Sequence, residues 1–316
     1  MRKILCLLLA VTAVVCVGCG GNKSETGNDT GQTIVFGLLP DVDSFPFVVA
    51  AERGYFADEG VKVELQSFKS AMDRDAALQS GNLDGAVSDM LAAAFAQDGG
   101  FAVKMTSSTD GNYVLLTAPD KNFSTVGELA GQEVAVSRNT IIEYVTDQIL
   151  ARENMADNSI KKVVIPQIPV RLEMLQNGKL TAATLPEPMA SVALDGGCRK
   201  IADASQLNIN PGVVLFTEKS LNGKKKEIAA LYRAYNKAVA YLNDAPPDEY
   251  IKLAIDKGGF PPAVKSSLTL QHYRTAVMPD ESDVQACLGW LTRKNLIKQS
   301  YTYEGLTENI LPAAKS

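Results

Sequence analysis

The chain has 316 residues, of which 46% are hydrophobic and 21% are charged, so it is long enough for two lobes with sizeable cores. Its formal net charge is −5 and no basic stripe is present, which argues against nucleic acid as a partner. The single histidine, His272, has no cysteine or acidic partner at helical spacing, so we expect neither a metal site nor a cofactor.

Residues 1–18 have the order of a signal peptide: two basic residues, an apolar run over residues 4–17, and the ending CVGC. The apolar run is too short to span a bilayer comfortably. The ending resembles a bacterial lipobox, with Cys16 where leucine is usual. By this resemblance, cleavage before Cys19 leaves a cysteine that receives lipid. The alternative is a signal peptide that is cut elsewhere and a secreted protein.

Residues 19–32 predict a flexible tether, because they are rich in Gly, Ser, Asn and Thr and offer no apolar side chain to pack beyond Cys19. Export would leave Cys198 and Cys287 as the other cysteines. An oxidising compartment permits a disulfide between them, but they are far apart and have no framework spacing. We therefore favour two separate thiols. Without the two basic residues of the signal, 29 Lys and Arg stand against 36 Asp and Glu, a charge of about −7.

Past the tether, short apolar runs alternate with helical patterns, which is typical of strand–helix–strand units. The expected strands are TIVFGLL (33–39), VKVEL (61–65), GAV (85–87) and FAVKMTSS, and the expected helices are FPFVVAAERGYF, AMDRDAALQSG and DMLAAAFAQDGG. These units predict a parallel sheet with helices on its faces. In such sheets, ligands bind at the carboxyl ends of the strands.

The segment LQSGNLDGAVSD (78–89) is echoed by LQNGKLTAATLP (175–186). Each copy has a helix that ends in Leu-Gln, then a capping glycine and a strand with small residues. Two ordinary helix–glycine–strand turns would share these features by chance. A second set of strands and helices surrounds the later copy, however, and favours two similar α/β lobes.

Four segments stand in the order found in periplasmic binding proteins of the nitrate, sulfonate, taurine and thiamine-pyrimidine-precursor group of ABC importers: GYFADEGVKVEL, LQSGNLDGAVSD, TVGELAGQEVAVSRNTIIEYV and LPEP. The resemblance covers residues 33–242, with GELAGQE in place of the family's DLKGK-like turn. It implies an α/β, type II-like periplasmic-binding-protein fold, with two parallel or mixed sheets flanked by helices and a hinge of two crossing strands. Lobe one would comprise residues 33–116 and 213–316, and lobe two residues 117–212, with hinge strands at its ends.

Glu187 lies between two prolines at the end of a predicted strand. Pro186 ends the strand and Pro188 is tolerated in the first turn of the next helix, so the glutamate is held beside a helix start. Either it stabilises its own helix, or it contacts a ligand. We expect Glu187 and Asp89 to occupy corresponding strand ends and to face each other across the cleft. Two carboxylates there favour a nitrogen heterocycle or an amine as the ligand.

The other candidate ligand contacts also lie just beyond predicted strand ends, where capping or turn formation is the alternative for several of them, and pairing with a carboxylate or solvation is the alternative for Arg138. They are Asp41, Asp43, Ser44 and Phe45 after the first strand, Ser88 beside Asp89, Ser108 and Asp110 in a turn, and Ser137, Arg138, Asn139 and Thr140. The last group begins a helix, whose free N–H groups are able to hold an anion together with Arg138. This arrangement would favour the alternative ligands of the family: sulfonate, nitrate or taurine.

The resemblance implies an extracytoplasmic, lipid-anchored, monomeric protein that captures a small organic molecule and delivers it to an ABC permease. A thiamine-pyrimidine biosynthetic enzyme is the less favoured alternative. The fungal enzyme that resembles this family uses an active-site histidine with pyridoxal phosphate and a cysteine-rich motif, and the predicted cleft segments have neither. We therefore expect a binding protein and not an enzyme.

Replacing Cys19 by alanine should abolish the incorporation of labelled lipid and release the protein from the membrane fraction, because no thiol remains to carry the lipid. The folded domain should keep its melting temperature, since the tether has nothing to pack. Unaltered lipid labelling would contradict the lipobox assignment.

Overall fold

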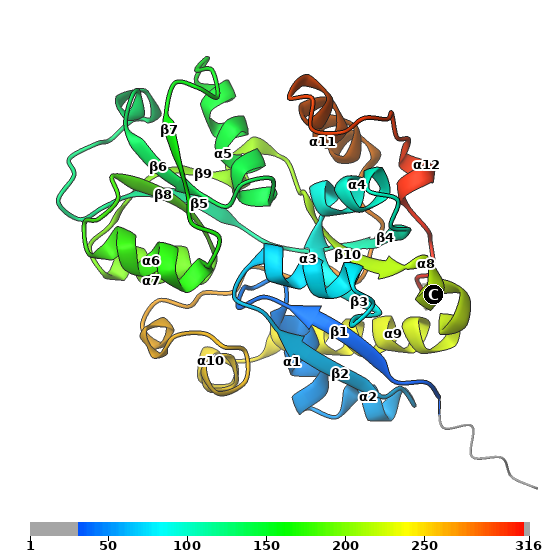
Figure 1. The fold of residues 1–316 in the computed structure, drawn as a ribbon. Coiled ribbons are helices and arrows are strands. Elements are labelled where there is room, and N and C mark those ends of the chain that lie inside the picture. Colours follow the sequence, from blue (N-terminus) through cyan, green and yellow to red (C-terminus); the bar gives the residue numbers. More distant parts are fainter. Residues whose placement is uncertain (1–30, 313–316) are drawn as a thin grey trace, which may run out of the picture. The chain divides into compact units, whose positions relative to one another are not determined.

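Two five-stranded mixed sheets organise the chain in the computed structural model, which describes residues 31–312 (Figure 1). The predicted signal peptide, Cys19 and most of the predicted tether lie outside the described residues. Within residues 31–312, no helix has the length and apolar character needed to cross a membrane. We call each sheet, with the helices that cover it, a lobe.

The first sheet has the strand order β2-β1-β3-β10-β4, in which β10 is the only antiparallel member. Its strands are β1 (Ile34–Leu38), β2 (Val63–Ser67), β3 (Gly85–Asp89), β4 (Val103–Ser108) and β10 (Gly212–Thr217). The helices between them are α1 (Phe45–Glu52), α2 (Tyr55–Asp58), α3 (Ala71–Gln79) and α4 (Met90–Asp98).

The second sheet has the matching order β7-β6-β8-β5-β9, with β5 antiparallel to its neighbours. Its strands are β5 (Tyr113–Thr117), β6 (Glu133–Val136), β7 (Lys161–Val164), β8 (Ala182–Pro186) and β9 (Arg199–Asp203). Its helices are α5 (Ile141–Arg152), α6 (Ile168–Gln176) and α7 (Met189–Asp195), with 3₁₀ turns η1 (Val126–Leu129) and η2 (Ala204–Leu207).

The internal repeat is a duplicated helix–strand unit. The bounds of α6 and β8 lie 97 positions after those of α3 and β3, since residues 71 and 89 correspond to residues 168 and 186. Strands β3 and β8 are also the central strands of their sheets. The two copies therefore occupy equivalent places in the two lobes.

Two connections cross between the sheets, residues 109–112 from β4 to β5 and residues 204–211 from β9 to β10. Because β5 pairs within the second sheet, the first crossing precedes the boundary that we expected at residue 116. The first crossing and the start of β10, where the second crossing ends, pack tightly around Asp43: a Cβ at Gly111 would overlap its carboxylate, and one at Gly212 would overlap the Thr109 hydroxyl. No side chain fits at either glycine without a shift of its neighbours.

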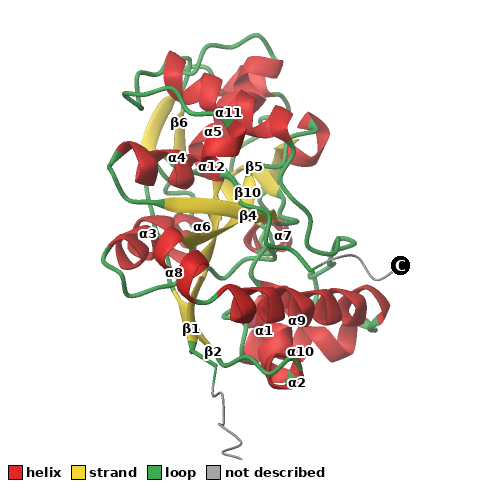
Figure 2. Ribbon diagram, turned by 90° about the vertical axis from the view of Figure 1, so that its right-hand side faces the viewer, coloured by secondary structure: helices red, strands yellow, loops and turns green. Residues whose placement is uncertain are grey.

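The C-terminal part adds α8 (Glu218–Gly223), α9 (Lys225–Asp244), α10 (Pro247–Asp256), η3 (Pro262–Lys265), α11 (Glu281–Arg293) and α12 (Tyr303–Leu306). Helix α9 runs beside α1 (Figure 2), and its buried Tyr235 ring lies 4.9 Å from that of Phe47. The aromatic side chains Tyr232 and Tyr235 of α9 are therefore part of the core. Helix α11 contacts α4 in the first lobe, while its Trp290 donates to Asp147 on α5.

Both cysteines of the described chain are buried free thiols. Cys198 precedes β9, and Cys287 lies within α11. The preference for two separate thiols over a disulfide is confirmed for these two residues.

Replacing Gly111 by alanine should lower the free energy of unfolding by about 1–3 kcal/mol, because the added methyl group overlaps a buried carboxylate that has little room to move. Gly223→Ala is the matched control, since no atom lies within 4 Å of a Cβ there. Urea denaturation measures both. Equal stability of the two variants would show that the crossing is not tightly packed.

Candidate functional site

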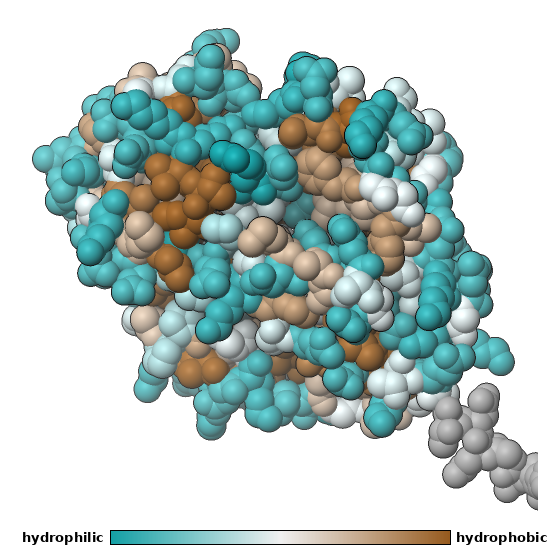
Figure 3. Space-filling model, in the orientation of Figure 1, coloured by the Kyte–Doolittle hydropathy of each residue, from teal (hydrophilic) through white to brown (hydrophobic). Residues whose placement is uncertain are grey.

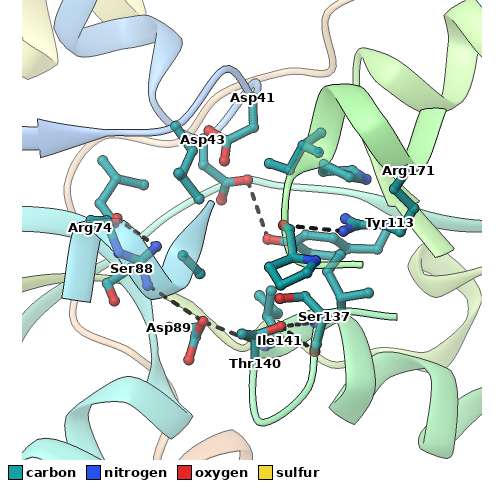
Figure 4. A pocket seen from close by; sticks show the side chains of 17 residues that line it. Asp41, Asp43, Arg74, Ser88, Asp89, Tyr113, Ser137, Thr140, Ile141 and Arg171 are labelled. Carbon is teal, nitrogen blue, oxygen red and sulfur yellow. Dashed lines mark hydrogen bonds and ion pairs between the residues drawn. The ribbon is translucent and has the colours of Figure 1, made fainter. Parts of the chain in front are cut away.

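A cavity lies between the two lobes, at the carboxyl ends of β1, β3, β6 and β8 (Figure 4). Its volume is about 30 Å³, room for one or two water molecules. The first lobe lines it with the loop after β1, the start of α3 and the end of β3. The second lobe contributes Tyr113, the N-terminus of α5, and the first turns of α6. The side chains of the two lobes thus nearly meet.

Hydrogen bonds between the lobes surround the cavity. The Val42 N–H donates to the carbonyl of Glu187 at 3.1 Å, and the Ile168 N–H donates to the carbonyl of Lys69 at 3.0 Å. The Ile141 N–H points at the carboxylate of Asp89, 3.4 Å away. These contacts hold the lobes in a closed arrangement.

Six of the predicted ligand contacts line this cavity, and all six are buried: Asp41, Asp43, Ser88, Asp89, Ser137 and Thr140. Four come from strand ends or the loops that follow them, and Ser137 and Thr140 precede α5. The expectation that side chains beyond the carboxyl ends of strands lie close together therefore holds for these six residues. Their contact with a ligand remains a prediction.

Two predicted contacts are placed differently. Glu187 does not line the cavity: its carboxylate accepts the Ser191 N–H at 3.0 Å in the first turn of α7, and it meets the first lobe only through its backbone carbonyl. The expectation that it faces Asp89 was wrong, because its own helix satisfies the carboxylate. Phe45 packs against Phe260 in the core, with 5.4 Å between ring centroids, and offers no surface to a ligand there.

The other predicted residues outside the cavity have local partners or face solvent. Ser44 accepts the Leu39 N–H, Ser108 donates to the Val277 carbonyl, and Asp110 pairs with Arg274; Arg138 and Asn139 are exposed beside the helix start. These contacts are made within the protein and leave the five residues outside the cavity.

Arg171, on α6, is fully buried and lines the cavity. Its guanidinium donates from Nε to the Thr184 carbonyl at 2.9 Å and from Nη1 to the Ile165 carbonyl at 2.7 Å. Its Nη2 has no hydrogen-bond partner, and no carboxylate within residues 31–312 lies within ion-pair distance. Burial lowers the pKa of Arg171 to about 10, so the group is still charged at neutral pH. A buried cation is thus left without a counter-charge.

Arg74, on α3, is the counterpart of Arg171 in the duplicated unit, 97 positions earlier. It donates to the Val87 carbonyl at 3.1 Å, which corresponds to Thr184, the acceptor of Arg171. Unlike Arg171, it is neutralised, since its Nη2 lies 2.7 Å from Asp75 and 3.9 Å from Asp89. Burial alone would lower the pKa of Arg74, but the two carboxylates raise it.

Asp41 and Asp43 occupy the side of the cavity opposite the start of α5 (Figure 4). Burial, together with the neighbouring Asp41 carboxylate, raises the pKa of Asp43 to about 7. Asp43 accepts the Thr109 hydroxyl at 2.5 Å and the Tyr113 hydroxyl at 3.3 Å. Burial also raises the pKa of Asp41, which caps the Ser44 N–H. This pair is less negative at neutral pH than two free aspartates.

Helix α5 turns its N-terminus toward the cavity. Thr140 caps it by accepting the Ile142 N–H at 3.2 Å, and the Ile141 N–H remains directed at Asp89. Ser88, next to Asp89, is buried and its hydroxyl has no partner. Within residues 31–312 no cluster of side chains is suited to hold a metal ion.

The two arginines escaped the sequence-based prediction. Each stands four positions before the leucine of the repeat, in AMDRDAALQ and IPVRLEMLQ. The predicted repeat began at the leucine, so the matching arginines were not compared. Extending the repeat by one helical turn would have found them.

An apolar groove adjoins the site. It has a volume of about 370 Å³ and is lined from both lobes by residues that include Met72, Val164 and Val170, which are among the exposed apolar side chains of the described chain. Pro166 lines both this groove and the cavity. The face shown in Figure 3 carries several hydrophobic patches, drawn in brown, which hydrophilic side chains separate from one another.

The family model described as "NMT1/THI5 like" matches residues 41–249. A comparison with curated proteins by sequence gives no match. Among solved structures, the alkanesulfonate-binding protein SsuA from Xanthomonas axonopodis pv. citri bound to MOPS is similar, with a TM-score of 0.75 and 19% identity over 88% of this chain and 98% of that one.

Two further structures are similar over most of their length. The periplasmic aliphatic sulphonate-binding protein SsuA from Escherichia coli has a TM-score of 0.72 and 18% identity over 90% of this chain and 94% of its own. The periplasmic nitrate-binding protein NrtA from Synechocystis PCC 6803 has a TM-score of 0.72 and 15% identity over 85% and 83%. The predicted periplasmic-binding-protein fold is confirmed.

The pKa of Asp43 predicts a pH-dependent stability. An unfolded aspartate ionises at about pH 3.9, so between there and about pH 7 the folded chain binds one proton more than the unfolded chain. Asp43 should therefore contribute a fall of about 1.4 kcal/mol per pH unit to the free energy of unfolding as pH rises through this window. Asp43→Asn should remove this contribution in ligand-free protein and leave that of other buried carboxyls, such as Asp75, whose pKa burial raises to about 6.

Urea denaturation of the wild type and Asp43→Asn at several pH values tests the prediction. Asp98→Asn is the control, because a hydrogen bond from the Lys298 N–H lowers the pKa of that half-buried carboxyl and keeps it out of the window. If the free energies of unfolding of the wild type and Asp43→Asn changed with pH in parallel, Asp43 would be ionised in the folded protein over the whole pH window.

Proposed function

The chain belongs to the NMT1/THI5-like family, and from that membership and the charges around its cavity we propose that it is the solute-binding component of an ABC importer and takes a small organic anion. The observation that carries the choice of an anion is the buried Arg171, whose charge has no carboxylate partner in the described chain. A buried charge is costly unless it is paired, and an anionic ligand supplies the missing partner.

The acids of the cavity do not make the same demand for a cation. Asp89 lies between Arg74 and the Ile141 N–H, and Asp43 accepts two hydroxyl hydrogen bonds and is partly protonated at neutral pH. The protein itself therefore compensates these carboxylates. This balance favours the anion over the nitrogen heterocycle or amine that Asp89 and Glu187 suggested from the sequence.

The similar structures support the same class, since they are those of sulfonate-binding and nitrate-binding proteins. A sulfonate has three acceptor oxygens, which suit convergent donors from Arg171, Ser88 and the start of α5. Because these donors come from both lobes, ligand binding would stabilise the closed arrangement that a permease recognises. The proposal includes an extracytoplasmic location, a lipid anchor at Cys19 and a monomeric state.

Replacing Arg171 by glutamine should weaken binding of methanesulfonate or nitrate by about tenfold to a hundredfold, since a hydrogen bond to a charged group contributes about 1.5–3 kcal/mol. Arg171→Lys keeps the charge and should lose less. Arg138→Gln is the matched control, because this exposed arginine lies outside the cavity. Isothermal titration calorimetry measures the three affinities.

Tighter binding of an aminopyrimidine or an amine than of either anion would overturn the anion assignment. An effect of Arg138→Gln as large as that of Arg171→Gln would move the anion to the exposed side of the α5 start. Arg171 also ties α6 to β8, so its replacement could disturb the fold. Circular dichroism of each variant is the control for this effect.

A further inference from the structure

The carboxylate of Asp89 reaches from the first lobe to the second (Figure 4). One oxygen, Oδ1, caps α4 by accepting the Ala92 N–H at 2.8 Å. The other, Oδ2, lies 3.4 Å from the Ile141 N–H of α5 and 3.9 Å from Nη2 of Arg74. Asp89 is 2% exposed, so water does not screen this charge well.

The same place offers what an anionic ligand needs. Helix α5 is 12 residues long, so its N-terminus carries a partial positive charge, and its Ile141 N–H is directed into the cleft. Two further groups around the cavity point independently to a ligand: the buried Ser88 hydroxyl and Nη2 of Arg171, neither of which has a hydrogen-bond partner among residues 31–312. Burial raises the pKa of Asp89, whereas Arg74 and the N–H groups of Ala92 and Ile141 favour its ionised form. Its Oδ2 is an acceptor at the edge of this set of donors.

We infer that Asp89 is a specificity-determining residue that competes with the ligand for the α5 N-terminus and so selects monoanions over dianions. The inference rests on the proposed anion-binding function. A ligand oxygen either displaces Oδ2 from the Ile141 N–H or binds beside a negative charge that is held in place by the α4 cap. Repulsion from that charge doubles when the ligand carries two negative charges, whereas one negative charge is enough to neutralise Arg171.

The structure provides a conservative variant and a matched control. Asparagine is as good a helix cap as aspartate, so Asp89→Asn should keep the bond to Ala92 while it removes the charge. Serine is an equally suitable uncharged cap if the asparagine variant fails to fold. Asp75→Asn also removes a carboxylate from Arg74, but Asp75 does not line the cavity or contact the second lobe.

Calorimetry of the full chain with methanesulfonate and with sulfate tests the inference. Asp89→Asn should bind methanesulfonate about tenfold more tightly than the wild type does, as expected when a nearby like charge is removed. Sulfate affinity should rise by a larger factor, so that the preference for methanesulfonate shrinks. Asp75→Asn should change this preference less.

Weaker methanesulfonate binding by Asp89→Asn would overturn the inference and show that the Asp89 carboxylate supports the anion site instead of competing with the anion. The inference would also be overturned if Asp89→Asn raised the affinity for both anions by the same factor, or if Asp75→Asn raised the affinities as much as Asp89→Asn does. Either result would show that Asp89 acts only through its contribution to the overall charge. If the wild type binds methanesulfonate and only the Asp89 result fails, the proposed function survives. If neither the wild type nor Asp89→Asn binds either anion, both fail.

Discussion

The buried charge of Arg171 is the constraint around which the site is organised. Its guanidinium holds α6 against β8 and the end of β7 through carbonyl groups, which accept its hydrogen bonds but carry no counter-charge. The cost of burying a cation in this way is several kcal/mol, and the anionic ligand that we propose would reduce it. A charge that the fold leaves uncompensated thus couples the stability of the closed arrangement to the presence of ligand.

The internal duplication explains why Arg74 lines the same cavity as Arg171. The residue that follows each arginine explains why only Arg74 has a carboxylate partner within residues 31–312. Arg74 and Arg171 hold equivalent strand carbonyls from equivalent helices. The next residue is Asp75 in the first lobe but Leu172 in the second. The duplicated scaffold therefore supplies two similarly placed guanidinium groups, of which one is neutralised within its own lobe and the other is open to a ligand.

Asp43 connects the site to the two crossings. Its carboxylate accepts the hydroxyl of Thr109 from the first crossing and packs against Gly111 and Gly212, where the two crossings leave no space for side chains. It also lines the cavity, beside Asp41. Protonation of one buried carboxylate therefore affects both the packing of the crossings and the charge that a ligand meets. Binding and stability should share part of their pH dependence for this reason.

The sequence by itself determined the features that depend on local periodicity and chain order: the alternating strands and helices, the duplicated unit, the family, and the six strand-end or helix-start residues that line the cavity. Tertiary structure alone decided which side chains find partners. Glu187 is satisfied by its own helix and Phe45 by the core, whereas Arg171, on an ordinary helical pattern, is buried without a carboxylate. Whether a charge is compensated depends on groups distant in sequence, and helical spacing carries no information about them.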